Sequence, residues 1–115
     1  MGRGLSDMQK AALRIAYEAK QAGKRYTKGG HERPQVEPWE LLSQWYKWPV
    51  RDTYGLHFRT SDIGEAEYQA GKAAASRAVR RLEERGLVRR QWFPYTGHGY
   101  ELTEEGERVA RELIG

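Results

Sequence analysis

The sequence predicts a mainly α-helical fold that carries one small β-hairpin. Apolar residues recur at helical spacing in segments near both ends and in a basic stretch at 72–85. Two short runs with strand character, separated by a turn rich in glycine and aromatic residues, occupy about 87–102. A chain of 115 residues has the size of one domain, so we expect residues 1–115 to form a single unit.

The composition excludes several classes of function. No cysteine is present, which excludes a disulfide framework, a thiolate nucleophile and a zinc finger. The longest apolar runs are only a few residues, and the first ten residues lack the apolar core of a signal peptide. We therefore expect a cytoplasmic protein with no membrane partner.

The first predicted helix follows Ser6. Ser6 can cap it, and Gln9, three residues later, completes a capping box. Apolar residues then recur along one face, namely Met8, Ala11, Ala12, Ile15, Ala16 and Ala19. The pattern predicts a helix that runs to about Ala22 and stops at Gly23.

Residues 23–36 predict a loop, because they lack periodicity and contain three glycines and one proline. Four of its side chains could touch a phosphate backbone: Lys24, Arg25, Lys28 and Arg33. We favour a solvated loop over such a role.

A second helix is predicted from Pro38, because proline suits the first turn of a helix, and it must end before Pro49. A helix that is apolar on most sides is buried in a core or an interface. We favour a core or dimer contact for this one, with a small-molecule pocket as the alternative. The residues concerned are Trp39, Leu41, Leu42, Trp45, Tyr46 and Trp48. Residues 49–59 predict a turn with an extended piece.

A helix-turn-helix is predicted over residues 61–85. Thr60 or Ser61 can cap a short supporting helix, 61–71. A turn near Ala70 and Gly71 then leads into a basic helix, 72–85, in the place of a recognition helix.

Helix 72–85 separates apolar from basic residues. At about 100° per residue, its inward arc holds Ala75, Ala78, Val79 and Leu82. The opposite face and its flanks hold Ala73, Ser76, Arg77, Arg80, Arg81 and Glu84. Arg77 and Arg80 are best placed to donate to base edges. Lys72, Ser76 and Arg81 suit phosphates.

Positive charge is concentrated on this helix and its exit. Residues 72–90 contain seven Lys or Arg and two acids, a net charge of +5, whereas the whole chain carries +4 and the remainder therefore −1. Such placement is typical of a protein that binds a polyanion. The alternative is a solvated helix whose arginines pair with Glu83 and Glu84, and Arg80 does stand four residues before Glu84.

Gly86 is expected to end the basic helix, and the hairpin at about 87–102 follows as a wing. Its tip, 94–99, carries side chains that can reach a minor groove or a phosphate: Tyr95, Thr96 and His98. Arg89 and Arg90 lie on its first strand, and no later residue of the hairpin is Lys or Arg. A plain hairpin that only completes the sheet therefore stays open as an alternative.

Thr103 can cap a closing helix whose first turn carries two acids. The apolar stripe of this helix consists of Leu102, Val109, Ala110 and Leu113. Basic helix, hairpin and closing helix, in that order, form the DNA-reading half of a winged helix-turn-helix domain.

A resemblance to a known family rests on three runs: Ser76-Arg77, LEERGLV at 82–88 and LTEEG at 102–106. Together they resemble the DNA-binding lobe of the MarR-like winged helix-turn-helix regulators, over residues 72–114. The resemblance implies a dimeric, repressor-like transcription regulator with dimer contacts from its terminal helices and often a small-molecule effector.

The sequence thus predicts a sequence-specific double-stranded DNA-binding protein, a transcription regulator. The expected DNA-binding residues are Lys72, Ala73, Ser76, Arg77, Arg80, Arg81, Arg89, Arg90, Tyr95 and His98. A homodimer is expected, because one recognition helix covers few base pairs. Its contacts are expected from the first helix (Met8, Ala12, Ile15), the last helix (Val109, Leu113) and also the Trp39–Trp48 helix. The alternative is that the same residues fill the core of the monomer. A winged helix for protein–protein contact, and a DNA-binding protein of replication or mobile elements, stay open as alternatives.

Catalysis is not expected. His31, His57 and His98 are far apart, and no pair has the spacing of metal ligands on a helix. Gly29-Gly30 is not followed by the Lys-Ser/Thr start of a phosphate-binding helix. We expect neither a cofactor nor a metal.

Overall fold

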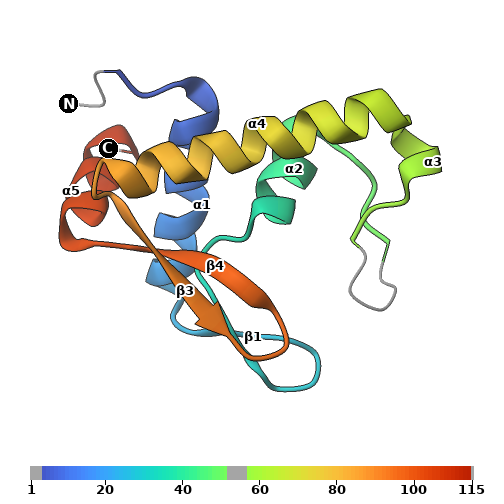
Figure 1. Cartoon of the computed structure of the whole chain (residues 1–115). Helices are drawn as coiled ribbons and strands as arrows, with labels where there is room; N and C mark the ends of the chain where they lie inside the picture. The colour runs from blue at the N-terminus through green and yellow to red at the C-terminus, as the bar shows by residue number, and fades with distance from the viewer. Residues whose placement is uncertain (1–3, 52–56, 115) are drawn as a thin grey trace.

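The computed structural model describes residues 4–51 and 57–114. Helix α1 (Asp7–Ala22) lies in the middle of the fold and contacts α2 (Pro38–Tyr46), α4 (Glu65–Glu84) and α5 (Glu104–Ile114). Figure 1 shows α4 crossing over α1 and α2, with α5 close to the end of α4. Helices make up most of the chain, as the sequence predicts. Within the described ranges, no helix is both long and apolar enough to cross a membrane.

Both ends of α1 are confirmed. The Ser6 hydroxyl accepts a hydrogen bond from the Gln9 N–H (3.1 Å), and the Gln9 side-chain oxygen accepts one from the Ser6 N–H (3.0 Å). This capping box satisfies donors that the first helical turn leaves unpaired. Gly23, with φ of 98°, ends the helix in a conformation that favours glycine.

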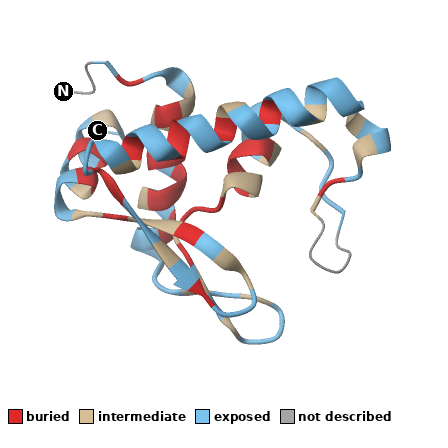
Figure 2. Cartoon of the chain, in the orientation of Figure 1, coloured by how far each residue is buried: buried red, intermediate tan, exposed pale blue. Residues whose placement is uncertain are grey.

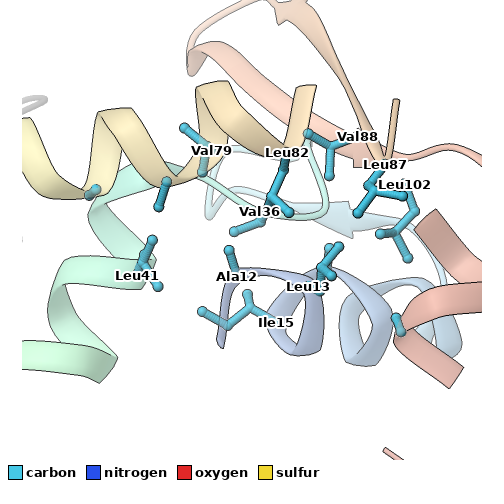
Figure 3. Close-up of a cluster of buried hydrophobic side chains, with 14 of the residues drawn as sticks. Ala12, Leu13, Ile15, Val36, Leu41, Val79, Leu82, Leu87, Val88 and Leu102 are labelled. Atoms are coloured by element: carbon cyan, nitrogen blue, oxygen red, sulfur yellow. The ribbon is translucent and has the colours of Figure 1, made fainter. Parts of the chain in front are cut away.

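The core lies between α1, α2, α4 and the base of the hairpin. Side chains from different elements converge on it in Figure 3, among them Leu13, Leu41 and Leu82. Figure 2 shows the buried residues of α1 and α4 on the sides that face each other.

Residues expected at a dimer contact belong to this core. Ala12, Ile15 and Val109 are only 1%, 6% and 6% exposed within the single chain, and Met8 and Leu113 pack partly buried against them. Ala12, Ile15 and Val109 therefore fill the core of the single chain and offer no apolar surface to a partner, whereas Met8 and Leu113 are only half-buried.

The predicted loop 23–36 contains a small hairpin. Strand β1 (Arg25–Tyr26) pairs antiparallel with β2 (Glu32–Arg33). The turn between them is closed by backbone hydrogen bonds from Thr27 to His31 (2.8 Å) and from Gly30 to Thr27 (2.9 Å). Periodicity could not indicate this hairpin, because each strand has only two residues.

An ion cluster of Arg25, Arg33, Glu37 and Glu40 fixes this hairpin to the start of α2. The Arg25 Nη2 donates to Glu40 Oε1 (2.6 Å) and its Nε to the Pro34 carbonyl (3.0 Å). Arg33 Nε donates to Glu37 Oε2 (3.0 Å). Lys24 also pairs with Glu32 (3.9 Å), so three of the four basic side chains suggested for phosphate contact bind carboxylates of their own chain.

Helix α2 begins at Pro38, as predicted, and buries Leu41 and Leu42. Immediately before it, Val36 forms an antiparallel bridge with Tyr100, with N–H to carbonyl distances of 3.1 and 3.0 Å. The segment before α2 therefore extends the sheet of the second hairpin. Trp45, at the other end of α2, is 42% exposed, so the helix is not buried on all sides.

The predicted turn at Ala70 and Gly71 is wrong. Helix α3 (Thr60–Ile63) is a single turn, and α4 runs without interruption from Glu65. The break falls at Gly64, whose φ is 105°. Gly71 is buried inside α4, where an added Cβ would lie 2.4 Å from Trp48 Cη2. This glycine lets an aromatic ring approach the helix and does not make a turn.

The second hairpin, β3 (Val88–Phe93) and β4 (Gly97–Leu102), is confirmed. Gly86, with φ of 75°, follows α4, and Leu87 N–H bonds back to the Leu82 carbonyl at 2.9 Å. Gly99 lies so close to Pro34 that a Cβ would stand 2.0 Å from the proline Cγ. The two hairpins therefore pack through a glycine–proline contact.

Helix α5 begins as predicted, because the Thr103 hydroxyl accepts a hydrogen bond from the Gly106 N–H at 3.0 Å. Val109 and Ala110 are its buried residues along with Gly106. An added Cβ at Gly106 would lie 1.8 Å from the Leu87 carbonyl oxygen. This contact places α5 directly against the base of the hairpin.

We predict that the ion cluster contributes to stability through the pairing of its members. Glu40→Gln or Arg25→Met leaves a largely buried charge without its partner and should lower the free energy of unfolding by about 3 kcal/mol. The double variant Arg25→Met/Glu40→Leu should recover most of that loss, because the charges leave together. Urea unfolding gives these values. Glu104→Gln, on the exposed start of α5, is the control, and additive losses in the double variant contradict the prediction.

Candidate nucleic-acid interface

The predicted faces of α4 are confirmed over residues 72–84. Ala75, Ala78, Val79 and Leu82 are the buried residues of this part of the helix. Those expected to contact DNA are exposed, and they are Lys72, Ala73, Ser76, Arg77, Arg80 and Arg81. Burial of a narrow apolar stripe thus leaves every arginine of the helix in solvent.

The three arginines of α4 have no acid partner in the described part of the chain. Arg77, Arg80 and Arg81 form no ion pair there, although Glu84 stands one turn beyond Arg80. The arginines of α5, in contrast, pair with their own helix: Arg108 with Glu112 (2.8 Å). The positive charge of α4 is therefore not neutralised locally.

Strand β3 directs its two arginines to opposite faces of the hairpin, because successive side chains alternate. Arg90 shares a face with Val88 and Trp92, and its cross-strand partner is Tyr100. Arg89 lies on the other face, opposite Glu101. The sequence analysis expected both to bind DNA, and the structure places them on opposite faces of the hairpin.

Tyr100 lies within reach of the charges of both Arg80 and Arg90. Burial raises the pKa of the Tyr100 phenol above its ordinary value, and the charge of Glu83 raises it further. The charges of Arg90 and Arg80 act in the opposite direction on the same group. Arg80 on α4 and Arg90 on the hairpin thus both act on the Tyr100 phenol.

Arg77 and Arg81 border the other flank of α4. There they line a shallow pocket of about 270 Å³ with the start of α1, including Ser6 and Gln9. Arg77 and Arg81 thus border the start of α1, whereas Arg80 and Arg90 act on Tyr100 at the hairpin. Lys72 lies nearer the exposed start of α4, with its Nζ 5.0 Å from the centre of the Tyr68 ring.

The two predicted wing residues have different surroundings. Tyr95 is 80% exposed but stacks on His31 of the first hairpin's turn, with ring centres 3.6 Å apart. His98 lies edge-on to Trp92, with ring centres 5.2 Å apart. His98 is thus on the face of Arg90, whereas Tyr95 is held toward the first hairpin.

Trp92 is the residue that sequence reasoning missed. It is 66% exposed and lies on the hairpin face that carries Arg90 and His98. The signal was present in the sequence, because residues two apart in a strand share a face and Trp92 follows Arg90 by two. An exposed tryptophan beside a free arginine is suited to contact with a base or sugar.

Each of the three histidines contacts a different aromatic ring. His57 stacks on Trp39, with ring centres 4.3 Å apart, while His31 stacks on Tyr95 and His98 lies edge-on to Trp92. In residues 4–51 and 57–114, no group of three or more His, Asp or Glu is arranged to hold a metal ion.

No protein-family model, no curated protein and no solved structure matches this chain significantly.

We predict that the Tyr100 phenol reports the positions of the arginines. Arg80→Gln and Arg90→Gln each remove a positive charge that lowers the pKa of Tyr100, so each should raise this pKa further. Arg89→Gln, from the opposite face, is the matched control and should leave it unchanged. NMR titration of 13C-labelled tyrosines, with Tyr100→Phe for assignment, measures the effect. An equal response to all three changes contradicts the placement.

Proposed function

We propose that the chain is a sequence-specific double-stranded DNA-binding protein, a transcription regulator of the winged helix-turn-helix type. The observation that carries the proposal is the uncompensated cationic face of α4, continued by Arg90 on the adjacent hairpin. Phosphate contacts supply most of the affinity of proteins for DNA, and free arginines on one face are the groups that make them.

The arrangement of elements supports this function. Helix α4 packs on α2 along its inner stripe, presents its outer face to solvent, and is followed directly by a hairpin. In the proposal α4 is the recognition helix, and α2 takes the supporting place that the sequence assigned to residues 61–71. The bridge from Val36 to Tyr100 ties the hairpin to the start of this supporting helix.

The proposed roles follow from side-chain position. Arg77 and Arg80 point away from the core in the middle of α4, where a helix in the major groove meets base edges. Ala73 and Ser76 are small, so they let the helix approach closely. Lys72, Arg81 and Arg90 lie at the margins of this face and bind phosphates.

The hairpin acts as a wing through the face of Arg90. Trp92 and His98 form the exposed aromatic pair on that face, and such rings contact sugars and bases in a minor groove. Tyr95 is turned toward His31, so its role at the DNA is secondary. We further propose that two copies bind two half-sites as a homodimer, because one α4 covers few base pairs.

We predict salt-dependent binding to double-stranded DNA. Fluorescence anisotropy with a random-sequence duplex should show an affinity that falls linearly, on logarithmic axes, with a slope of about −0.9 for each phosphate contact. Selection from random duplexes should then enrich one site. If the enriched site is palindromic, two symmetry-related copies of the protein bind it. Binding that is absent at low salt, or indifferent to salt, refutes the proposed function. A winged helix that serves only protein–protein contact would show this absence of salt-dependent DNA binding.

We predict different losses of affinity from the two arginines of β3. Arg90→Ala should weaken specific and non-specific DNA by a similar factor, whereas Arg89→Ala should change either by less than about twofold. Arg80→Ala should cost about 1–3 kcal/mol on the selected site and relax the preference at one or two base pairs. A loss at Arg89 as large as that at Arg90 is inconsistent with the hairpin face assigned here.

A further inference from the structure

One face of the second hairpin carries an exposed tryptophan on a fixed backbone. Trp92 is the last residue but one of β3 and is 66% exposed. The strands beneath it are held in place, since Phe93 is buried and Gly99 lies against Pro34. Figure 1 shows this end of the hairpin projecting away from α4. Trp92 thus presents a large flat ring to solvent at a site outside the helical body.

The ring of Trp92 is open, whereas that of its exposed neighbour Tyr95 is partly covered. Tyr95 stacks on His31, with ring centres 3.6 Å apart and an angle of 21° between the rings. His98 meets Trp92 at 74°, with ring centres 5.2 Å apart. An edge-to-face pair of this kind occupies at most one face of the indole. Among the described residues, no ring is stacked on Trp92 from the other side.

The surroundings of Trp92 favour an anion. Arg90 lies two residues earlier on the same face, about 6–7 Å along the strand. Its guanidinium forms no ion pair within residues 4–51 and 57–114. The opposite face, in contrast, places Glu101 across from Arg89. The side chains on the face of Trp92 include no acid, and they are Val88, Arg90, Trp92, His98, Tyr100 and Leu102.

A guanidinium and an open indole at this spacing suit one nucleotide. The guanidinium donates to phosphate oxygens, and an aromatic ring stacks on any base, because every base has a π face. A base inside a duplex must first be unstacked, and that step costs at least as much free energy as one indole restores. A base that is already unpaired presents its face without this cost. The chemistry therefore favours a single strand over an intact duplex.

We propose that Trp92 and Arg90 bind one nucleotide of single-stranded DNA, with the base stacked on the indole and a neighbouring phosphate bound by the guanidinium. His98 borders the base from the opposite strand of the hairpin. Taken with the proposed function, on which this part rests, the chain recognises duplex DNA that carries an unpaired flank. Binding of a single strand by itself does not rest on that function.

The binding test uses the full chain and labelled DNA of three kinds: a blunt duplex, the same duplex with a short thymidine overhang at its 5′ or 3′ end, and a thymidine single strand. Fluorescence anisotropy should show that an overhang of one polarity raises the affinity at least about fivefold, the lower limit for one stacked base. The single strand should bind at low salt. Equal affinities for the blunt duplex and both overhang duplexes, or no binding of the single strand, overturn the proposal.

Two variants with a matched control test the assigned ring and cation. Trp92→Ala should reduce the advantage of the overhang to less than about twofold, and the ratio of affinities cancels any contact of Trp92 with the duplex. Arg90→Gln should lower the salt slope for the single strand by about 0.7, the value for one phosphate contact. Tyr95→Ala removes the more exposed but already stacked ring and should keep the advantage. An advantage that survives Trp92→Ala, or an equal loss in Tyr95→Ala, contradicts the assignment.

NMR locates the stacked base directly. The indole N–H signals of the tryptophans would be followed as the thymidine strand is added, with Trp92→Phe for assignment. The signal of Trp92 should shift, whereas that of Trp45, an exposed tryptophan of α2, should stay in place. A shift at Trp45 without one at Trp92 contradicts the proposed site.

Two outcomes separate this proposal from the proposed function. Binding of the single strand through Trp92, without affinity for the blunt duplex, refutes duplex recognition and leaves the single-strand site in place. Salt-dependent binding of the blunt duplex, with no gain from an overhang of either polarity, refutes the single-strand site and leaves the proposed function in place.

Discussion

Burial of the narrow stripe formed by Ala75, Ala78, Val79 and Leu82 is the interaction on which the rest of the structure depends. Complete burial of one Val or Leu side chain contributes about 1.5–3 kcal/mol, whereas an exposed ion pair contributes about 0–1 kcal/mol. Burial of the stripe therefore fixes the rotation of α4 about its own axis. The arginines of α4 are then placed on the opposite, outward face. Because α1, α2 and the base of the hairpin pack against the side of α4 that carries the stripe, the arginines on its other side face solvent.

Three glycines set the close contacts around this stripe. Gly71 admits the Trp48 ring to α4, Gly99 admits Pro34 to the hairpin, and Gly106 admits the Leu87 carbonyl to α5. A helical glycine such as Gly106 costs about 1 kcal/mol relative to alanine, yet any Cβ there would overlap the backbone of Leu87. The contacts of Gly99 and Gly106 fix the position of the second hairpin relative to Pro34 and α5.

Local signals in the sequence were sufficient for several elements. The capping box of Ser6, the cap at Thr103 and the stop at Gly86 need only neighbouring residues, and each is confirmed. Gly71 was misjudged, because the sequence does not distinguish a glycine that turns the chain from one that admits a distant ring. The first hairpin depends on the pairing of Arg25 with Glu40, fifteen residues away, which no local pattern indicates.

The candidate site also contains one part that the local sequence predicts and one part that depends on contacts between distant residues. The outer face of α4 follows from helical geometry alone, so Arg77 and Arg80 could be placed in advance. The separation of Arg89 from Arg90 required the strand register, and the stack of Tyr95 on His31 required the two hairpins to meet. One face of the second hairpin thus carries Arg90, Trp92 and His98, whereas its turn contacts the first hairpin through Tyr95.

The most direct test of the account is NMR mapping of the protein with a DNA duplex. Backbone and arginine side-chain signals would be followed as the duplex is added. The account predicts changes at Arg77, Arg80, Arg90 and Trp92, with none at Arg89 or along the outer face of α5. Changes confined to α5 or to the face of Arg89, or no changes at low salt, would contradict the claim that α4 and one face of the second hairpin form the DNA-binding surface.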